Sequence, residues 1–399
     1  MRLRELAALF LKLGTVSFGG PAAHIALIES EVVRKRQWLT QQQFLDMLGA
    51  ANLIPGPTST EMAINVGFVR AGWIGMCVAG ASFIFPAAII TGAFAWAYVR
   101  FGNLPQAAGV LGGIKAAVIA VVALAIWRLG KSAVKDSGLA ALGGLTLAAF
   151  FLDANPVAIL FGGGFVGMLG RVAAHWRSRG VSALSMLPFR LTSLSFRPTA
   201  WPLRQWTLSR LLPAVASIAV ATSVTTRPTL GRIALYFLKV GAVLYGGGYA
   251  LLAFLEHGLV QEHAWLTQQQ LLDAVAIGQF TPGPVLSTAT FIGYILGGVP
   301  GAAVATIGIF LPSFFYVALL APVLFRLRQS SWIAAFLDSV NVSAVMLMTG
   351  VTSRLALDAL RGWDSWAIAL VSLAALLRWK VSPAWVVLGG GVAGFILLR

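Results

Sequence analysis

Two kinds of short segment in this sequence could bind an anion. A Gly-Gly pair and, further on, a Pro-Gly-Pro turn each occur twice. A helix cannot continue through Pro-Gly-Pro, because proline lacks the amide hydrogen and restricts the residue before it. The helix that starts after such a turn has free N–H groups, and these groups and the helix dipole favour negative charge.

Hydroxyl side chains follow each Pro-Gly-Pro and could replace water around an oxyanion. We expect Pro21 and Pro57 at the first position of a helix, just ahead of the free amides. In the second copy Gly248 stands where the first has Pro21, so the two sites need not bind anions equally. The candidate substrate-binding residues of these segments are Gly19, Gly20, Pro55, Gly56, Pro57, Thr58, Ser59, Gly246, Gly247, Pro282, Gly283, Pro284 and Ser287. The competing interpretation is that they only pack and kink helices.

Three lysines inside apolar segments are further candidates for binding the anion. Lys12 and Lys239 precede the two Gly-Gly pairs, and Lys115 lies in another apolar segment. Ionisable residues within membrane segments face a cavity by default and mark an ion pathway. The alternative for Lys12 is that its long side chain extends to the nearer membrane surface, because only about two helical turns separate it from Glu5.

Among the acidic residues, Glu61 is the candidate for proton coupling. It lies one turn beyond the first Pro-Gly-Pro, where a carboxylate could exchange protons or balance a lysine. Asp46 and Asp273 are expected near a membrane surface or in local pairs. His24 follows the first Gly-Gly pair, but its counterpart Leu251 argues against an essential role.

The sequence offers no signature of a catalytic or metal site. Its 4 histidines and 1 cysteine show no metal-ligand spacing, and it contains neither a catalytic triad signature nor a phosphate-binding loop. We therefore expect a protein that needs no cofactor or metal and is not an enzyme. The more remote alternative, an intramembrane enzyme acting on lipid phosphates, would need a carboxylate, an arginine and a nucleophile together at membrane depth, and we find no such cluster.

Composition indicates an all-α polytopic membrane protein. The 399 residues are 58% hydrophobic and 11% charged. Runs such as 73–99, 107–127 and 298–325 exceed the roughly 20 residues that span a bilayer. The formal charge of +16 comes from basic residues scattered between apolar runs, which is typical of cytoplasmic loops rather than of nucleic-acid binding.

The chain is an internal duplication. Comparing 12–57 with 239–284 gives 20 identities in 46 positions, including WLTQQQ and Pro-Gly-Pro, far above chance. With one residue removed the match continues to the last apolar segments. We therefore expect a first repeat at 1–171, a basic linker at 172–228 and a second repeat at 229–399.

The two repeats differ in loop charge, and this difference predicts opposite orientations in the membrane. Arg34-Lys35-Arg36 in the first repeat becomes Gln261-Glu262-His263 in the second. Inverted-topology repeats of this kind occur in many secondary transporters. The scheme needs roughly 10 to 13 membrane segments, one of them a marginal crossing at 211–224 in the linker.

The repeated WLTQQQ segment predicts a helix start. Thr40 and Gln43 form a capping box, and Trp38 is an expected interfacial anchor. The helix that follows reaches Pro-Gly-Pro after about 14 residues, or roughly 20 Å, which places the break inside the membrane. Two arrangements remain open: re-entrant hairpins with their tips at Gly-Gly and Pro-Gly-Pro, or a full crossing broken in the middle.

At these residues the sequence resembles the chromate ion transporter (CHR) family in its long, two-domain form. The resemblance rests on Gly19-Gly20, Val33, Trp38, Pro55-Gly56-Pro57, Gly67 and Gly75, repeated as Gly246-Gly247, Val260, Trp265, Pro282-Gly283-Pro284, Gly293 and Gly301. It implies a multi-pass protein of the bacterial inner membrane that exports chromate and confers chromate resistance, driven by the proton motive force. Sulfate would be the structural analogue.

The sequence leaves two questions open. The first is whether chromate is the substrate of a dedicated exporter or one anion of a broader sulfate or oxyanion carrier or channel. The second is the assembly state, for which a homodimer is one option. The partners expected in either case are the oxyanion, protons and the lipid bilayer, and no nucleic acid.

Overall fold

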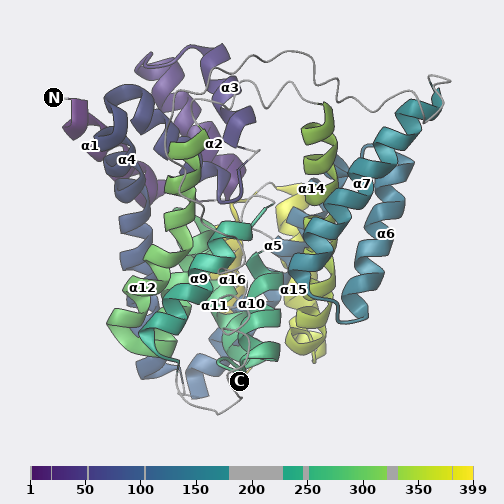
Figure 1. Cartoon of the computed structure of the whole chain (residues 1–399). Coiled ribbons are helices and arrows are strands. Elements are labelled where there is room, and N and C mark those ends of the chain that lie inside the picture. The colour runs from purple at the N-terminus through teal and green to yellow at the C-terminus, as the bar shows by residue number, and fades with distance from the viewer. Residues whose placement is uncertain are drawn as a thin grey trace, which may run out of the picture. The chain divides into compact units, whose positions relative to one another are not determined.

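The computed structural model describes residues 2–18, 20–51, 54–102, 105–178, 228–245, 251–320, 331–379 and 381–398, and the regular structure within them is helical (Figure 1). This confirms the expected all-helical class. The elements of the first repeat are α1 (Arg2–Val16), α2 (Pro21–Glu29), the π-helix η1 (Ser30–Lys35), α3 (Gln41–Ala51), α4 (Thr58–Phe101), α5 (Pro105–Ala133), α6 (Ser137–Phe151) and α7 (Pro156–Ser178).

The second repeat forms the same series of elements in the same order, with one short helix, η4, added before its long α12. They are α9 (Leu230–Val243), α10 (Leu251–Leu255), the π-helix η3 (Glu256–Glu262), α11 (Gln268–Phe280), the short 3-10 helix η4 (Val285–Ser287), α12 (Thr288–Leu320), α14 (Ser331–Ala359), α15 (Trp363–Arg378) and α16 (Pro383–Leu397). The sequence duplication is therefore also a structural duplication.

The long helices α4 and α12 each reverse direction near their first third. The reversal occurs at Ala71-Gly72 in α4 and at Gly297-Gly298 in α12, where the glycines have φ of 60° and 61°. Gly72 and Gly298 tolerate this left-handed backbone because they have no β-carbon. Each element is thus a pair of antiparallel helices rather than one long rod.

Small residues let the two arms of α4 pack closely. A β-carbon added at Gly67 would lie 2.6 Å from Cβ of Ala79, and one added at Gly75 would meet the carbonyl oxygen of Gly67. The arms of α12 pack in the same way through Gly293 and Gly301. The glycines that repeat in the sequence are therefore the contact points of these helical pairs.

The first three helical segments and the first arm of α4 form two hairpins that open at the same end. Arg70, at the end of that arm, lies 3.6 Å from the carboxylate of Glu5 near the start of α1. The Arg70 guanidinium also lies 4.8 Å from the centre of the Trp38 ring, which precedes α3. The chain thus returns twice to the end from which it started, which favours hairpins over a broken crossing.

Both WLTQQQ segments begin a helix through the expected capping box. The amide of Gln43 donates to Oγ1 of Thr40 at 3.2 Å, and the amide of Thr40 donates to Oε1 of Gln43 at 2.9 Å. Thr267 and Gln270 form the same reciprocal pair at the start of α11. The predicted start signals are confirmed in both repeats.

The two repeats interleave rather than standing apart. Helix α7 packs on α14 of the second repeat, where a β-carbon at Gly163 would meet the hydroxyl of Ser343. Helix α16 packs in the corresponding way on α5, where a β-carbon at Gly390 would lie 2.5 Å from Cβ of Ala117. The second arms of α4 and α12 also pack on each other. Each repeat therefore completes the packing of the other.

Four described helices are long and apolar enough to cross a membrane. They are Thr58–Phe101, Ala108–Ala133, Val285–Leu319 and Trp332–Ala359, and Ser137–Phe151, Pro156–Arg171 and Pro383–Leu397 are shorter apolar helices. These lengths agree with a polytopic membrane protein. Residues 1–170 and 227–399 belong to one compact unit, and the proposed crossing at 211–224 lies outside the described residues.

Within this unit the equivalent hairpins occupy different ends. Figure 1 shows α1–α3 gathered at the upper end, whereas α10 and α11 lie in the lower half. The long helices α5 and α14, one from each repeat, pack on each other.

Candidate functional site

The hairpin tips of the two repeats meet in the interior. The amide of Gly283, in the second Pro-Gly-Pro, donates to the carbonyl oxygen of Ser17 at the end of α1, at 2.9 Å. A β-carbon at Gly283 would lie 3.1 Å from the carbonyl oxygen of Gly14 and 2.8 Å from Cβ of Ala87. This close backbone contact joins the first tip of one repeat to the second tip of the other.

Two helices of the first repeat begin at these tips. Helix α2 begins at Pro21 after Gly20, as expected, whereas Pro57 is the residue that caps α4 rather than its first helical residue. The first bonds of α4 run from the amides of Thr60 and Glu61 to the carbonyl oxygen of Pro57, at 2.8 and 3.1 Å. The amides of Thr58 and Ser59 precede these bonds and have no intrahelical acceptor.

The second repeat presents a similar helix start. Pro284 caps η4, and the Ser287 amide donates to the carbonyl oxygen of Pro284 at 2.9 Å. The Ser287 hydroxyl accepts a hydrogen bond from the hydroxyl of Thr91, on the second arm of α4, at 3.2 Å. Ser287 is therefore a buried polar contact between the repeats.

His24 connects the parts of the first repeat around these tips. Its side chain is buried, with Nδ1 3.3 Å from Oγ of Ser59 and Nε2 3.1 Å from the carbonyl oxygen of Ser17. The same carbonyl accepts the Gly283 amide. The sequence comparison undervalued His24, because its counterpart Leu251 suggested a dispensable position, and the structure places it at the centre of the contact.

Glu61 lies in the first turn of α4 and is fully buried. Neither carboxylate oxygen makes a hydrogen bond within the part of the chain that the structure describes. A β-carbon at Gly56 would meet Oε1 of Glu61 and would lie 2.6 Å from Oγ of Ser313 on α12, another buried oxygen with no described hydrogen-bond partner. The carboxyl thus folds back toward Pro-Gly-Pro and faces the other repeat.

The predicted cation Lys115 is buried, but it is already paired. Its Nζ lies 2.8 Å from Oδ1 of Asp273 on α11, and both side chains are almost fully buried. The hydroxyl of Tyr98 donates to the other oxygen of Asp273 at 2.8 Å. The expectation that Asp273 lies at a membrane surface or pairs locally is wrong, because its partners belong to the first repeat and no sequence spacing links them.

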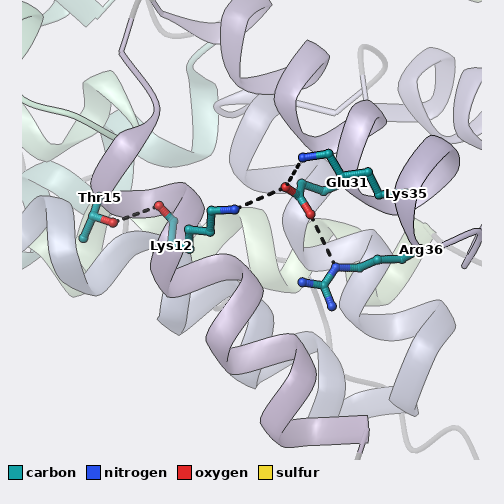
Figure 2. A network of polar contacts seen from close by, with 5 residues as sticks. All are labelled: Lys12, Thr15, Glu31, Lys35 and Arg36. Carbon is teal, nitrogen blue, oxygen red and sulfur yellow. Dashed lines mark hydrogen bonds and ion pairs between the residues drawn. The ribbon is translucent and has the colours of Figure 1, made fainter.

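Lys12 lies at the edge of the first hairpin and contacts an ionic cluster. Figure 2 shows Glu31 between Lys12 on one side and Lys35 and Arg36 on the other. The Glu31 carboxylate lies 3.4 Å from Lys12 Nζ, 2.9 Å from Lys35 Nζ and 3.5 Å from Arg36 Nε. The Lys12 side chain is 60% exposed, so its amine is accessible despite the pair.

The remaining predicted residues are placed only in part. Lys239 is exposed on α9 and makes no ion pair with any other described residue. Pro55 is partly buried, and Gly56, Pro57, Thr58, Pro282, Gly283 and Pro284 are buried. Gly19, Gly246 and Gly247 lie outside the described residues. The two Pro-Gly-Pro turns are therefore enclosed by protein in this arrangement.

An apolar groove among the described residues is separate from the tips. It has a volume of about 420 Å³ and lies between α1, α4 and α12, lined by apolar side chains such as Phe85, Phe310 and Phe314. It contains no charged side chain, so it does not provide an anion site.

No group of three or more His, Cys, Asp or Glu within the described ranges is arranged to hold a metal ion.

Apolar helices of membrane length, two interleaved repeats and helix starts enclosed by protein are typical of multi-pass membrane transporters. Comparison with known proteins identifies the family. The chromate transporter family model matches twice, at residues 4–168 and 231–395, and the chain belongs to this family. It is thus a transporter and not an enzyme, which removes the alternative of a lipid-phosphate enzyme.

Several curated proteins are similar over nearly the whole chain. The chromate transport protein of Cupriavidus metallidurans is 33% identical over 99% of this chain and 93% of its own length. The probable chromate transport protein of Synechococcus elongatus is 32% identical over 95% and 90%, and the chromate transport protein of Pseudomonas aeruginosa is 28% identical over 100% and 93%. No solved structure matches the chain.

Proposed function

We propose that this protein exports chromate across the bacterial inner membrane and thereby confers chromate resistance. Family membership and the names of its relatives support chromate as the substrate. The main support for the location of the anion site is the hydrogen bond between the Gly283 amide and the Ser17 carbonyl oxygen. This bond brings helix starts of both repeats into one enclosed region. Such starts attract anions through free amides and the helix dipole.

In this proposal the oxyanion sheds water onto amides and hydroxyls at the tips. The amides of Thr58 and Ser59 and the hydroxyls of Thr58, Ser59 and Ser287 are its ligands on α4 and η4. The Gly-Gly pairs and both Pro-Gly-Pro turns let the backbone approach it. No base, metal or cofactor is required, because a tetrahedral dianion needs only donors and positive charge.

The three lysines have different positions in this scheme. Lys12 and Lys239 are accessible and supply positive charge along the pathway to the tips. Lys115 acts only in a conformation in which its bond to Asp273 is broken, because the pair neutralises it here. Rocking of one repeat against the other would change access to the tips and break this contact.

We further propose that the repeats are inverted in the membrane, with re-entrant hairpins at their starts and roughly 10 to 13 membrane segments in all. The arrangement in Figure 1, with α1–α3 and α10–α11 at different ends, supports this orientation. We expect the basic cluster at 34–36 and the α1–α3 end to lie in the cytoplasm. The basic part of the linker 172–228 that precedes the expected crossing at 211–224 would lie on the same side, between repeats 1–171 and 229–399.

The membrane potential assists this transport. A dianion leaving an inside-negative cell gains about 2.3 kcal/mol per charge for each 100 mV. Proton coupling through Glu61 would act in addition to this voltage term. The voltage term alone can therefore drive export in the absence of a pH gradient.

The test is uptake of radiolabelled chromate into inside-out vesicles that contain the protein, with voltage and pH gradient clamped separately. Vesicles without the protein and vesicles with excess sulfate are the controls. Protein-dependent accumulation that sulfate blocks is the expected result. No chromate flux in vesicles with verified insertion would contradict chromate as the substrate.

A broader sulfate or oxyanion carrier or channel is the second candidate. Amides and hydroxyls recognise the shape and charge of a tetrahedral dianion rather than the element at its centre. Direct sulfate uptake in the same vesicles at a rate equal to that of chromate would favour this candidate.

A further inference from the structure

The carboxyl group of Glu61 is placed against the helix start that the proposed function uses for the anion. Glu61 is the fourth residue of α4, and its side chain folds back past Pro57 to meet Gly56. Side chains on helices point toward the N-terminus, so this direction is the normal one. The carboxyl therefore lies within the positive field of the same free amides that would hold an oxyanion.

Among the described residues, no positive group balances this carboxyl. Within the described ranges Glu61 forms neither an ion pair nor a side-chain hydrogen bond. Tyr245, just after α9, lies close enough to interact electrostatically with both Glu61 and Tyr316 of α12, and His24 on α2 reaches the same turn through Ser59. None of these is a lysine or an arginine.

Two hydroxyl groups in this region also have no hydrogen-bond partner among the described residues. Oγ of Ser313 and Oγ1 of Thr60 are fully buried, and neither makes a hydrogen bond within the part of the chain that is described. The first turn of α4 and the facing part of α12 therefore each have a hydroxyl donor that the Glu61 carboxyl does not use. This combination of free donors and an unpaired acid indicates a place where ligands are exchanged.

Two negative groups cannot share this turn. A buried carboxylate without a partner is costly, and a dianion a few ångströms away would add like-charge repulsion in a medium of low dielectric constant. The neutral acid avoids both penalties. The ionised form, in contrast, can itself accept bonds from the amides of Thr58 and Ser59 and stand in for the oxyanion.

We propose that Glu61 is a tethered competitor of the transported oxyanion, so that the anion binds at the start of α4 only after Glu61 has taken up a proton. This inference rests on the proposed function and adds the direction in which the coupled proton moves relative to the anion. The proton comes from water on the side where the anion enters and returns to water where the anion leaves. Proton and oxyanion therefore move in the same direction.

This sign of coupling determines the driving force. One dianion and one proton together carry a single negative charge, so the inside-negative potential still drives them out of the cell. The usual pH gradient opposes this movement, because the exported proton moves toward the acidic side. Voltage, and not the pH gradient, would then power export.

The second repeat provides an internal comparison. The alignment of the two repeats that matches Gly67 with Gly293 also matches Glu61 with Ser287. The Ser287 hydroxyl accepts a hydrogen bond from the hydroxyl of Thr91. The equivalent position thus holds a neutral group with a partner. Only the helix start of the first repeat has the carboxyl, so we expect one proton for each anion rather than two.

The experiment measures binding of radiolabelled sulfate and chromate to the purified full chain across one pH unit on either side of neutral. Sulfate remains a dianion over this range, so its pH dependence comes from the protein. For the wild type we expect affinity to fall about tenfold for each unit of increasing pH once Glu61 is ionised in the free protein. Glu61→Gln should bind with an affinity that does not change with pH.

Two variants serve as controls. Asp364→Asn removes an exposed carboxyl at the start of α15 and should leave affinity and pH dependence unchanged. Ser287→Ala should weaken binding and keep the wild-type pH dependence.

A second experiment measures transport in inside-out vesicles. An acidic lumen should slow chromate uptake by the wild type and have no effect on uptake by Glu61→Gln.

Three results would overturn the inference. Glu61→Gln with the wild-type pH dependence would exclude Glu61 as the competitor. Faster uptake by the wild type into an acidic lumen would indicate exchange of anion for proton instead. Failure of both anions to bind the folded wild type would refute the proposed function itself, and the inference with it.

Discussion

Lys115 of α5 and Asp273 of α11 form a buried ion pair that joins the two repeats, with Nζ and Oδ1 2.8 Å apart. Tyr98 of α4 donates a second bond to Asp273, at 2.8 Å. The shift that relates the repeats places Asp46 and Asn341 at the equivalent positions, so the second location lacks the lysine. This buried ion pair between the repeats therefore has no symmetry-related counterpart, so the contacts that hold the repeats together are asymmetric.

Breaking this pair should destabilise the protein strongly. Lys115→Met or Asp273→Asn leaves one buried charge without a partner, at a cost of about 3 to 5 kcal/mol each. The double variant should recover most of this loss, since it buries no unpaired charge. Chemical unfolding of the purified protein in detergent measures all three values. Additive losses in the double variant would contradict the direct pairing.

An exposed ion pair is the control for these single and double variants of Lys115 and Asp273. Lys135 and Asp338 also join the repeats, at 2.7 Å, but the Lys135 side chain is 56% exposed. Water screens such pairs, which contribute about 0 to 1 kcal/mol. Lys135→Met should therefore lower the free energy of unfolding by less than any single variant of the buried pair.

Enlarging Gly67 should disrupt the close packing of the two arms of α4. A β-carbon there would meet the carbonyl oxygen of Gly75, and backbone cannot move aside as a flexible side chain can. We expect Gly67→Ala to lower the free energy of unfolding by about 1 to 3 kcal/mol. Gly92→Ala, on the same helix but facing open space, should be neutral or slightly stabilising. Equal effects of the two substitutions would argue against this packing.

Removing Lys12 or Lys239 should impair transport without preventing membrane insertion. Losing one charged contact to the anion costs about 1.5 to 3 kcal/mol, which corresponds to roughly a 10- to 150-fold weaker apparent affinity for chromate. The measurement is concentration-dependent chromate uptake by Lys12→Ala and Lys239→Ala in inside-out vesicles. Unchanged affinity would remove these lysines from the pathway.

Glu31→Gln separates the two roles of Lys12. If Lys12 only balances the Glu31 carboxylate, the lysine becomes dispensable once that carboxylate is neutral. We expect instead that Glu31→Gln retains chromate uptake and that adding Lys12→Ala to it still abolishes most of the flux. Full uptake by the double variant would assign Lys12 to the Glu31 cluster alone.

The Glu31 cluster should also give the protein an acid-sensitive contribution to stability. The Lys35 ammonium, and then Lys12, hold the pKa of the Glu31 carboxyl below its ordinary value of about 4.5. A lowered pKa in the folded state stabilises the protein above the unfolded value, and this contribution is lost as the pH falls through the folded value. The difference in unfolding free energy between wild type and Glu31→Gln should be constant near neutral pH and shrink below about pH 4.5. A difference that grows on acidification would have the wrong sign.

The sequence alone determined the elements of this protein and their duplication. Local rules acted within a few residues: Thr40 and Gln43 capped a helix, Pro-Gly-Pro ended one, and apolar runs fixed the helices of membrane length. The repeated Gly67 and Gly75 were visible as a pattern, because the duplication preserved them. Glu61 was also accessible to sequence reasoning, since its distance from Pro57 is local.

Tertiary structure alone decided which of these elements meet. The bond between Gly283 and Ser17, the pairing of Lys115 with Asp273 and the position of His24 between Ser17 and Ser59 depend on packing across the fold. Lys115 and Asp273 are separated by more than a hundred residues, and no local spacing encodes their contact. The reason is physical: a buried charge is satisfied by whatever group the packed helices bring to it, and interleaving of the repeats is a property of the whole chain.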